Sequence, residues 1–161
     1  MNISDINKFI LDEDNMNQTI SAIVSVMENN SRYKSNTDAF IDADFTKNYC
    51  LLKFSKSDKE YFNAIFLDNK NKLIVSETLF SGSIDSCYVY TREIVKRALV
   101  LNASAIILAH NHPSGDPEPS SADVNITSKI KESLNLVDIR LLDHIVVGDG
   151  CSVSMASMNL M

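Results

Sequence analysis

Two histidines separated by a single residue, followed by a serine and an aspartate, form the pattern in this chain that is best suited to chemistry. His110 and His112 come directly after an apolar run, residues 105–109, that predicts a buried strand. Because side chains two residues apart on a strand point to the same face, both imidazoles are expected on one side of its end. Asp123 begins the next predicted helix and can fold back toward them. Two imidazoles and a carboxylate are a ligand set for a hydrolytic zinc ion with one position left for water.

The same residues also have structural interpretations. A single histidine usually belongs to a core or a surface, but two on one strand face beside Pro113 favour metal binding. Ser120 and Asp123 have the spacing of a capping box, in which the serine oxygen and the acid bind free N–H groups of a helix's first turn. We therefore expect Asp123 to bind the metal, and Ser120 both to cap the helix and to face the site.

A zinc site of this kind needs a base. Zinc lowers the pKa of a bound water from about 15.7 to about 7, and a nearby carboxylate can take its proton. Glu77 is the candidate, because it is the only acid in the strand predicted at residues 73–80. The pattern equally allows Glu77 to face solvent, since Ser76 and Thr78 are also polar.

The other histidine and the cysteines are expected to be structural. His144 lies in the largely apolar run 141–147, which favours a buried histidine that is structural or supports a ligand over one that binds metal itself. Cys50, Cys87 and Cys151 show no paired spacing and are expected to be small core residues rather than nucleophiles. The cysteine pattern predicts no disulfide framework and a reduced, cytoplasmic compartment.

The elements that must position these residues follow from hydrophobic periodicity. Residues 1–40 are expected to form a peripheral helical segment that ends in a polar linker, residues 28–36, and residues 41–161 to form the compact unit. In that unit the pattern predicts helices near 45–54, 91–101 and 121–135, and strands at 61–67, 72–80, 104–110, 139–147 and 152–155. Because a hairpin accompanies alternating strands and helices, we expect an α/β sandwich with a mixed, partly antiparallel β-sheet flanked by helices.

Composition narrows the class of protein. The chain has 161 residues, of which 45% are hydrophobic and 22% charged, as in an ordinary globular domain. Its longest apolar runs are far shorter than the roughly 20 residues of a membrane helix, and the N-terminus does not resemble a signal peptide. The net charge of −6 argues against a binder of duplex DNA, which normally carries a basic patch.

The full pattern is similar to a known family. Glu77, His110-x-His112, Ser120 and Asp123 match the JAMM (MPN-plus) metalloprotease motif. Residues 108–120, with segments at 66–68, 71–74, 80–83, 92–95 and 142–148, resemble the RadC branch of that superfamily, and the similarity covers about residues 40–157.

The resemblance implies a fold, a cofactor and an activity. The fold would be an MPN/JAB-type sandwich with cytidine-deaminase-like layering. His110, His112 and Asp123 would hold one zinc ion per chain, Glu77 would activate a water, and Ser120 would help to stabilise the oxyanion. The implied reaction is attack of that water on a peptide or isopeptide carbonyl of a protein or peptide substrate.

Two alternatives to a hydrolase remain. One is a nucleic-acid-processing accessory protein of DNA repair or of a mobile element, since the RadC family carries a DNA-repair label. Longer relatives have an N-terminal helix-hairpin-helix module with glycine-containing hairpins. The first of the four glycines here is Gly82, so that module is expected to be missing. The other alternative is a non-catalytic MPN scaffold, which would have no need for all five motif residues.

Two further classes are excluded by spacing. An HNH nuclease spreads its ligands over a ββα unit, and a zinc deaminase carries His-x-Glu followed by Pro-Cys-x-x-Cys; neither pattern is present.

Overall fold

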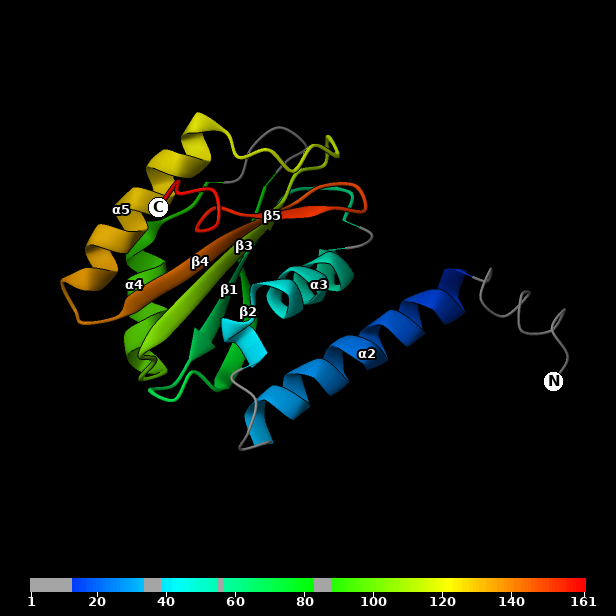
Figure 1. Cartoon of the computed structure of the whole chain (residues 1–161), viewed down its shortest axis with the longest axis horizontal. Coiled ribbons are helices and arrows are strands. Elements are labelled where there is room, and N and C mark those ends of the chain that lie inside the picture. Colours follow the sequence, from blue (N-terminus) through cyan, green and yellow to red (C-terminus); the bar gives the residue numbers. More distant parts are fainter. Residues whose placement is uncertain (1–12, 34–38, 55–56, 83–87) are drawn as a thin grey trace, which may run out of the picture.

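The computed structural model of the chain describes residues 13–33, 39–54, 57–82 and 88–161 (Figure 1). The helical character expected before Glu13 lies outside the described residues. The helices are α2 (Glu13–Tyr33), the short 3-10 helix η1 (Ala39–Ile41), α3 (Ala43–Phe54), α4 (Thr91–Val100) and α5 (Ser121–Asn135). The strands are β1 (Tyr61–Leu67), β2 (Leu73–Ser81), β3 (Ala105–Asn111), β4 (Arg140–Val147) and β5 (Ser152–Ser154).

Within the described residues, five strands form one open sheet in the order β2-β1-β3-β4-β5. β1 is antiparallel to both β2 and β3, β3 is parallel to β4, and β4 is antiparallel to β5. The parallel pair requires a crossover, which α5 supplies. The structure confirms the mixed, partly antiparallel sheet and the hairpin that the sequence predicted.

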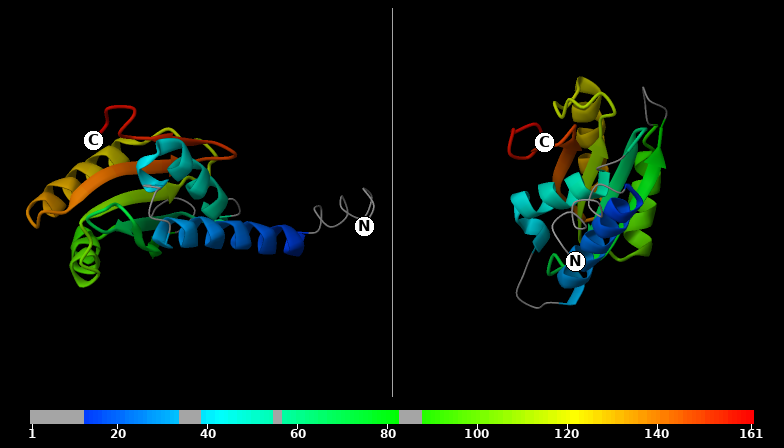
Figure 2. Two further views of the ribbon diagram at one scale, coloured as in Figure 1. Left: turned by 60° about the horizontal axis from the view of Figure 1, so that its bottom comes forward. Right: turned by 90° about the vertical axis from the view of Figure 1, so that its right-hand side faces the viewer.

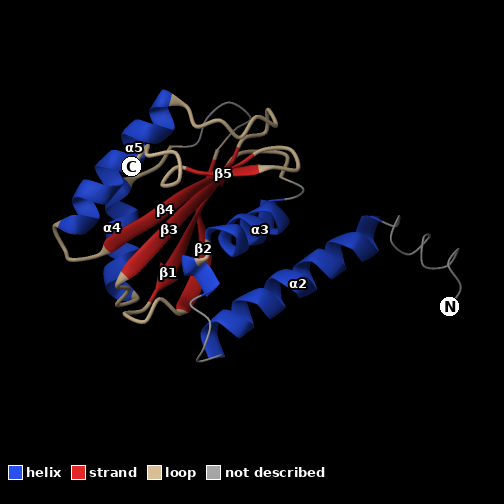
Figure 3. Ribbon diagram, in the orientation of Figure 1, coloured by secondary structure: helices blue, strands red, loops and turns tan. Residues whose placement is uncertain are grey.

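Helices cover both faces of this sheet (Figures 2 and 3). On one face, Tyr49 and Phe54 of α3 belong to a buried cluster that includes Ile107 of β3. On the other face, Ile94 of α4 and Ile130 of α5 belong to a second cluster. The sheet therefore lies between two helical layers, each closed by its own apolar core.

β3 is the strand that delivers the two histidines. All seven of its residues are buried, as expected of a strand covered on both faces. Ala105, Ile107 and Ala109 belong to the cluster on the α3 side, whereas Ile106 and Leu108 belong to the cluster on the α4 and α5 side. By the two-residue alternation, the side chain of residue 110 continues the second set and points to the α4 and α5 side at the end of the strand.

A polar linker was expected at residues 28–36. For residues 28–33 this prediction is wrong, because α2 continues to Tyr33. The Glu28 carboxylate accepts a hydrogen bond from the Tyr49 hydroxyl at 2.6 Å and lies 3.7 Å from Nζ of Lys53. These contacts with α3 stabilise the last turns of a polar helix that local pattern does not predict. No described helix, α2 included, combines the length and apolarity needed to cross a lipid bilayer.

The cysteines take different environments. Cys50 is buried, and burial raises the pKa of its thiol to about 12, which makes it a poor nucleophile. Cys151 is exposed, so its expected core position is wrong; it lies in the turn between β4 and β5. Cys87 falls outside the described residues.

Candidate metal centre

Two imidazoles and a carboxylate meet where β3 ends and α5 begins. Nε2 of His110 lies 3.0 Å from Nε2 of His112 and 3.2 Å from Oδ1 of Asp123. Nε2 of His112 lies 3.4 Å from Oδ2 of the same carboxylate. A tetrahedral zinc ion with ligands at about 2.0–2.2 Å places its donor atoms about 3.3–3.5 Å apart. One ligand atom from each of the three side chains lies within 4.8 Å of the others, so the two imidazoles and the carboxylate could hold one zinc ion.

The backbone fixes the orientation of His112. Its Nδ1 lies 2.8 Å from the carbonyl oxygen of Asp116. A carbonyl can only accept, so Nδ1 carries a proton, and in the neutral ring the Nε2 lone pair faces the candidate metal. The hydrogen bond to Asp123 is the main cause that raises the pKa of His112 above its ordinary value, while partial burial opposes it. Metal binding must therefore displace a proton that this pair holds.

Ser120 and Asp123 form a capping box and still leave the carboxylate at the site. The backbone N–H and the hydroxyl of Ser120 donate to Oδ2 of Asp123 at 2.7 and 2.6 Å, and the Asp123 N–H donates back to Oγ of Ser120 at 3.2 Å. Burial disfavours the charged carboxylate, but hydrogen bonds from His110, His112 and Ser120 outweigh it and lower the pKa of Asp123. The helix cap thus holds one ligand of the candidate site in its charged form.

His144 lies behind His110, away from the candidate metal. Its Nε2 is 2.8 Å from Nδ1 of His110, and its Nδ1 is 2.6 Å from Oγ1 of Thr127. His144 is completely buried, and burial lowers the pKa of its imidazole, so the ring is neutral. Its position agrees with a buried histidine that supports a ligand.

Glu77 is placed differently from the other predicted site residues. It pairs with Ala64 of β1, which in turn pairs with Leu108 of β3, whereas Phe62 of β1 lies opposite His110. Its carboxylate accepts hydrogen bonds from Nε of Arg97, at 2.7 Å, and from Nη2 of the same guanidinium. Arg97 lowers the pKa of Glu77. The structure therefore joins Glu77 to α4, whereas close contacts join His110, His112, Ser120 and Asp123 to one another.

Another carboxylate, Glu60, lies at the site and was missed by the sequence analysis. Phe62 pairs with His110 in the antiparallel β1–β3 ladder, so continuing the register places Glu60 opposite His112 and on the same face. Burial raises the pKa of the half-buried Glu60 carboxyl, while charges on His110 and His112 act to lower it. Only the pairing of β1 with β3 reveals what this residue faces, because its local sequence is that of an ordinary strand start.

Asn111, between the two histidines, clamps the backbone that carries Glu60. Its Oδ1 accepts from the Tyr61 N–H at 2.8 Å, and its Nδ2 donates to the Lys59 carbonyl at 2.9 Å. The Glu60 carbonyl itself accepts from the N–H of Gly82 at 2.9 Å. The backbone on both sides of Glu60 is thus tied to the residue that separates the two candidate ligands.

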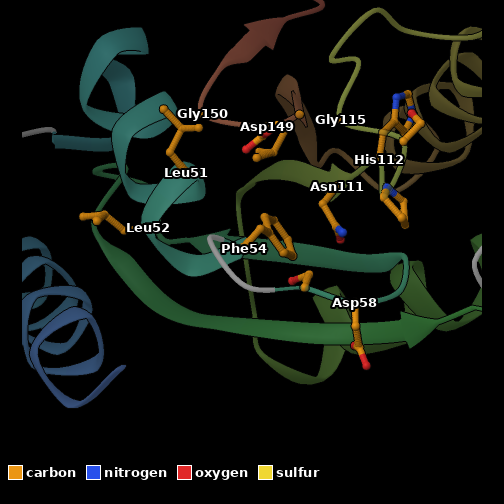
Figure 4. A pocket seen from close by; sticks show the side chains of 14 residues that line it. Leu51, Leu52, Phe54, Asp58, Asn111, His112, Gly115, Asp149 and Gly150 are labelled. Carbon is orange, nitrogen blue, oxygen red and sulfur yellow. The ribbon is translucent and has the colours of Figure 1, made fainter. Parts of the chain in front are cut away.

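A groove of about 740 Å³ borders His112 (Figure 4). One wall is apolar and comes from α3, with Leu51 and Phe54; the other comes from the loops at residues 111–115 and 147–150. Those two loops touch at Gly148, where an added Cβ would lie 2.3 Å from the carbonyl oxygen of Gly115. Of the three candidate metal ligands, His112 is the one that lines this groove.

Comparison with known proteins places these residues in a family context. The RadC-like JAB domain family matches residues 41–160. A UPF0758 protein of Marinomonas sp. is 53% identical over 121 residues, which are 75% of this chain and 54% of that protein. A UPF0758 protein of Vibrio vulnificus is 50% identical over 136 residues, 82% of this chain and 61% of that protein. The chain therefore spans little more than half the length of these two relatives.

Proposed function

The chain belongs to the RadC-like JAB domain family, and from this premise we propose that it is a zinc-dependent hydrolase that cleaves a peptide or isopeptide bond with water. One observation carries the proposal: two imidazole nitrogens and a carboxylate converge, with one ligand atom from each of the three residues within 4.8 Å of the others. The similarity to JAMM metalloproteases supports it, whereas the names of the relatives state no activity. Bound zinc would polarise the scissile carbonyl and lower the pKa of a water from about 15.7 to about 7.

In this proposal His110, His112 and Asp123 hold one zinc ion per chain. Each imidazole offers Nε2, and the carboxylate is kept charged by its hydrogen bonds. The carboxylate is also fixed by the cap at Ser120, so little side-chain freedom is lost when metal binds.

We assign the base to Glu60 in place of Glu77. A general base must lie within reach of the attacking water, which has to approach the metal beside the ligands. Glu60 extends from the strand end opposite His112, and the Asn111 clamp fixes the backbone on either side of it. The carboxylate of Glu77 is engaged by Arg97, and this lowers its pKa and weakens it as a base.

Ser120 is the proposed oxyanion donor. It is exposed at the start of α5, beside the metal ligand Asp123. Its hydroxyl proton is directed to the Asp123 carboxylate, so stabilising an oxyanion requires that proton to turn toward the substrate. One donor of this kind typically contributes about 10²–10³ in rate.

The proposed substrate is a protein or peptide. The groove beside His112 has an apolar wall and loop backbone on its other side, which suits an extended polypeptide segment better than a compact small molecule.

The test combines metal analysis with two internally quenched peptides. One peptide carries a central α-peptide bond, and the other carries glycine joined to a lysine Nζ by an isopeptide bond. We expect about one zinc per chain, loss of zinc in His110→Ala/His112→Ala, and turnover of at least one peptide. Glu60→Gln should bind zinc but lower turnover by about 10²–10⁴-fold, with Glu77→Gln as the matched control that keeps turnover.

Each other result contradicts a defined part of the proposal. If the wild-type protein binds no zinc after zinc is added, that result would contradict the proposed metal centre. Zinc bound without turnover of either peptide would contradict the hydrolase and favour a scaffold. Loss of turnover in Glu77→Gln but not in Glu60→Gln would return the base to Glu77.

A further inference from the structure

Three buried hydrogen bonds link two of the candidate metal ligands from behind. His110 contacts His144 through Nδ1, His144 contacts Thr127, and Oγ1 of Thr127 donates to the backbone carbonyl of Asp123 at 2.6 Å. We propose that Thr127 and His144 are positioning residues that keep the proton of His110 on Nδ1 and thereby aim its Nε2 lone pair at the metal. The inference rests on the proposed zinc site, but not on the hydrolytic activity.

The donor and acceptor of each hydrogen bond in this series follow from the backbone carbonyl of Asp123, at which the series ends. The Asp123 carbonyl can only accept, so it takes the single hydroxyl proton of Thr127. Oγ1 must then accept from His144, which places a proton of that ring on Nδ1. Nε2 of His144 is left as an acceptor, and it accepts from Nδ1–H of His110. When Nε2 of His110 binds a metal, the proton of its neutral ring must lie on Nδ1, where it donates to Nε2 of His144; without metal, Nε2 of His110 faces the Asp123 carboxylate.

The second acceptor near Thr127 does not change this assignment. Sδ of Met155 lies 3.8 Å from Oγ1, whereas the carbonyl of Asp123 lies at 2.6 Å. A thioether is a weak acceptor, so the hydroxyl proton stays on the carbonyl side.

Water cannot replace these bonds, because the three side chains are inside the protein. His144 and Thr127 are 0% exposed, and His110 is 1% exposed. Phe62 closes the space, since its ring is stacked on His110 with centroids 6.0 Å apart and lies edge-on to His144 at 5.4 Å. Loss of one hydroxyl would leave a buried N–H of His144 without an acceptor and weaken the preference for one tautomer.

The two candidate ligands are therefore oriented by different means. Nδ1 of His112 donates to a backbone carbonyl, that of Asp116. Nδ1 of His110 donates to a side chain, and that side chain depends on Thr127 of α5. Since the chain of bonds ends on the backbone of Asp123, it also ties the position of one ligand to that of another. Supports of this kind typically change metal affinity by 10–100-fold.

The test measures zinc affinity by competition with a chromogenic chelator, so it needs no substrate. Thr127→Val keeps the shape of the side chain and removes only the hydroxyl, and we expect zinc to bind about 10–100-fold more weakly. Thr127→Ser should restore wild-type affinity. Thr46→Val is the matched control, because Thr46 is also buried and donates to a backbone carbonyl, that of Phe40, but lies in α3 on the other face.

A second pair of variants tests the hydrogen bond between His144 and His110. Gln at position 144 can present an oxygen to Nδ1–H of His110, whereas Leu cannot. We expect His144→Gln to bind zinc more tightly than His144→Leu, with metal-free circular dichroism and Tm recorded for both. If either variant fails to fold, the Thr127 series still decides the question.

The outcomes separate the inference from the function it rests on. Wild-type affinity in Thr127→Val, with the fold intact, would overturn the positioning role while leaving the zinc site in place. Equal losses in Thr127→Val and Thr127→Ser would assign the effect to packing and likewise overturn it. A wild-type chain that binds no zinc would overturn the proposed metal centre itself.

Discussion

The Glu77 carboxylate and the Arg97 guanidinium form a bidentate ion pair that joins the edge strand β2 to α4. This pair occupies the acid that motif matching selects as the base. Glu60, directly before β1, instead lies opposite His112 when the β1–β3 register is continued beyond Phe62 and His110. The position of each carboxylate in the sheet, rather than its sequence context, is the ground on which we propose Glu60 as the base in place of Glu77.

We predict that disrupting this ion pair leaves hydrolysis intact. Arg97→Gln should keep wild-type turnover and zinc content, because the guanidinium holds an acid that does not take part in the reaction. The pair is partly exposed, with side chains 37% and 28% accessible, so the change in unfolding free energy should be small. Turnover of the quenched peptides and urea denaturation provide the measurements. A large loss of turnover in Arg97→Gln at unchanged stability would count against this assignment.

Acid is predicted to stabilise the metal-free protein through His112 and Asp123. The folded pKa of His112 is raised, so its contribution is fully present below the ordinary value of 6.5 and is lost as pH rises through the raised value. The folded pKa of Asp123 is lowered, so its contribution is present above 3.8 and is lost only as pH falls through the lowered value. The unfolding free energy that this pair contributes should therefore be larger at about pH 5 than at about pH 8.

Urea denaturation in the presence of EDTA checks this pH dependence. Asp123→Asn is the control. It should remove the part of the pH dependence of the unfolding free energy that comes from the His112–Asp123 pair. Zinc should reverse the trend, because protons compete with the metal for the same atoms and zinc binds better at higher pH. An unchanged pH profile in Asp123→Asn would show that other groups cause the effect.

Ser120 is predicted to have a structural and a chemical role that substitutions can separate. Ser120→Ala removes the cap of α5 and should cost about 1 kcal/mol of unfolding free energy, with a loss of turnover of about 10²–10³-fold. Ser120→Gly should cost only a few tenths of a kcal/mol but lose the same turnover, since Gly is tolerated at the cap. Ser120→Thr keeps a hydroxyl and should keep both. Thermal unfolding and peptide turnover, measured on zinc-loaded protein, distinguish the roles.

Asn111 is predicted to act on turnover through Glu60. Asn111→Asp retains an acceptor for the Tyr61 N–H but cannot donate to the Lys59 carbonyl, so one half of the clamp is lost. We expect zinc to remain bound and turnover to fall, together with about 1–3 kcal/mol of stability for the unpaired buried group. Metal analysis, denaturation and turnover are compared with Asn63→Asp, a buried amide in the middle of β1. Full turnover in Asn111→Asp would contradict the clamp.

The sequence by itself determined the elements and the candidate metal ligands. Period-two alternation and turn residues are local, so the strands from β1 to β5 and the helices α3 to α5 were predicted within a few residues. The histidine pair follows a buried strand, and the Ser120–Asp123 capping box starts the next helix, so their proximity also follows from short-range pattern. The spacing of these residues is therefore enough to predict a zinc-type ligand set.

Only the tertiary structure decided which other side chains surround that set. The continued β1–β3 register places Glu60 opposite His112, and Arg97 of α4 is hydrogen-bonded to Glu77; both relationships join residues far apart in the chain. The support behind His110 likewise depends on the parallel pairing that places His144 opposite Leu108. α2 continues past residue 28 because of its contacts with α3. Long-range pairing and packing leave no periodic signal in the local sequence, and this is the physical reason that sequence pattern identified the candidate ligands but not their surroundings.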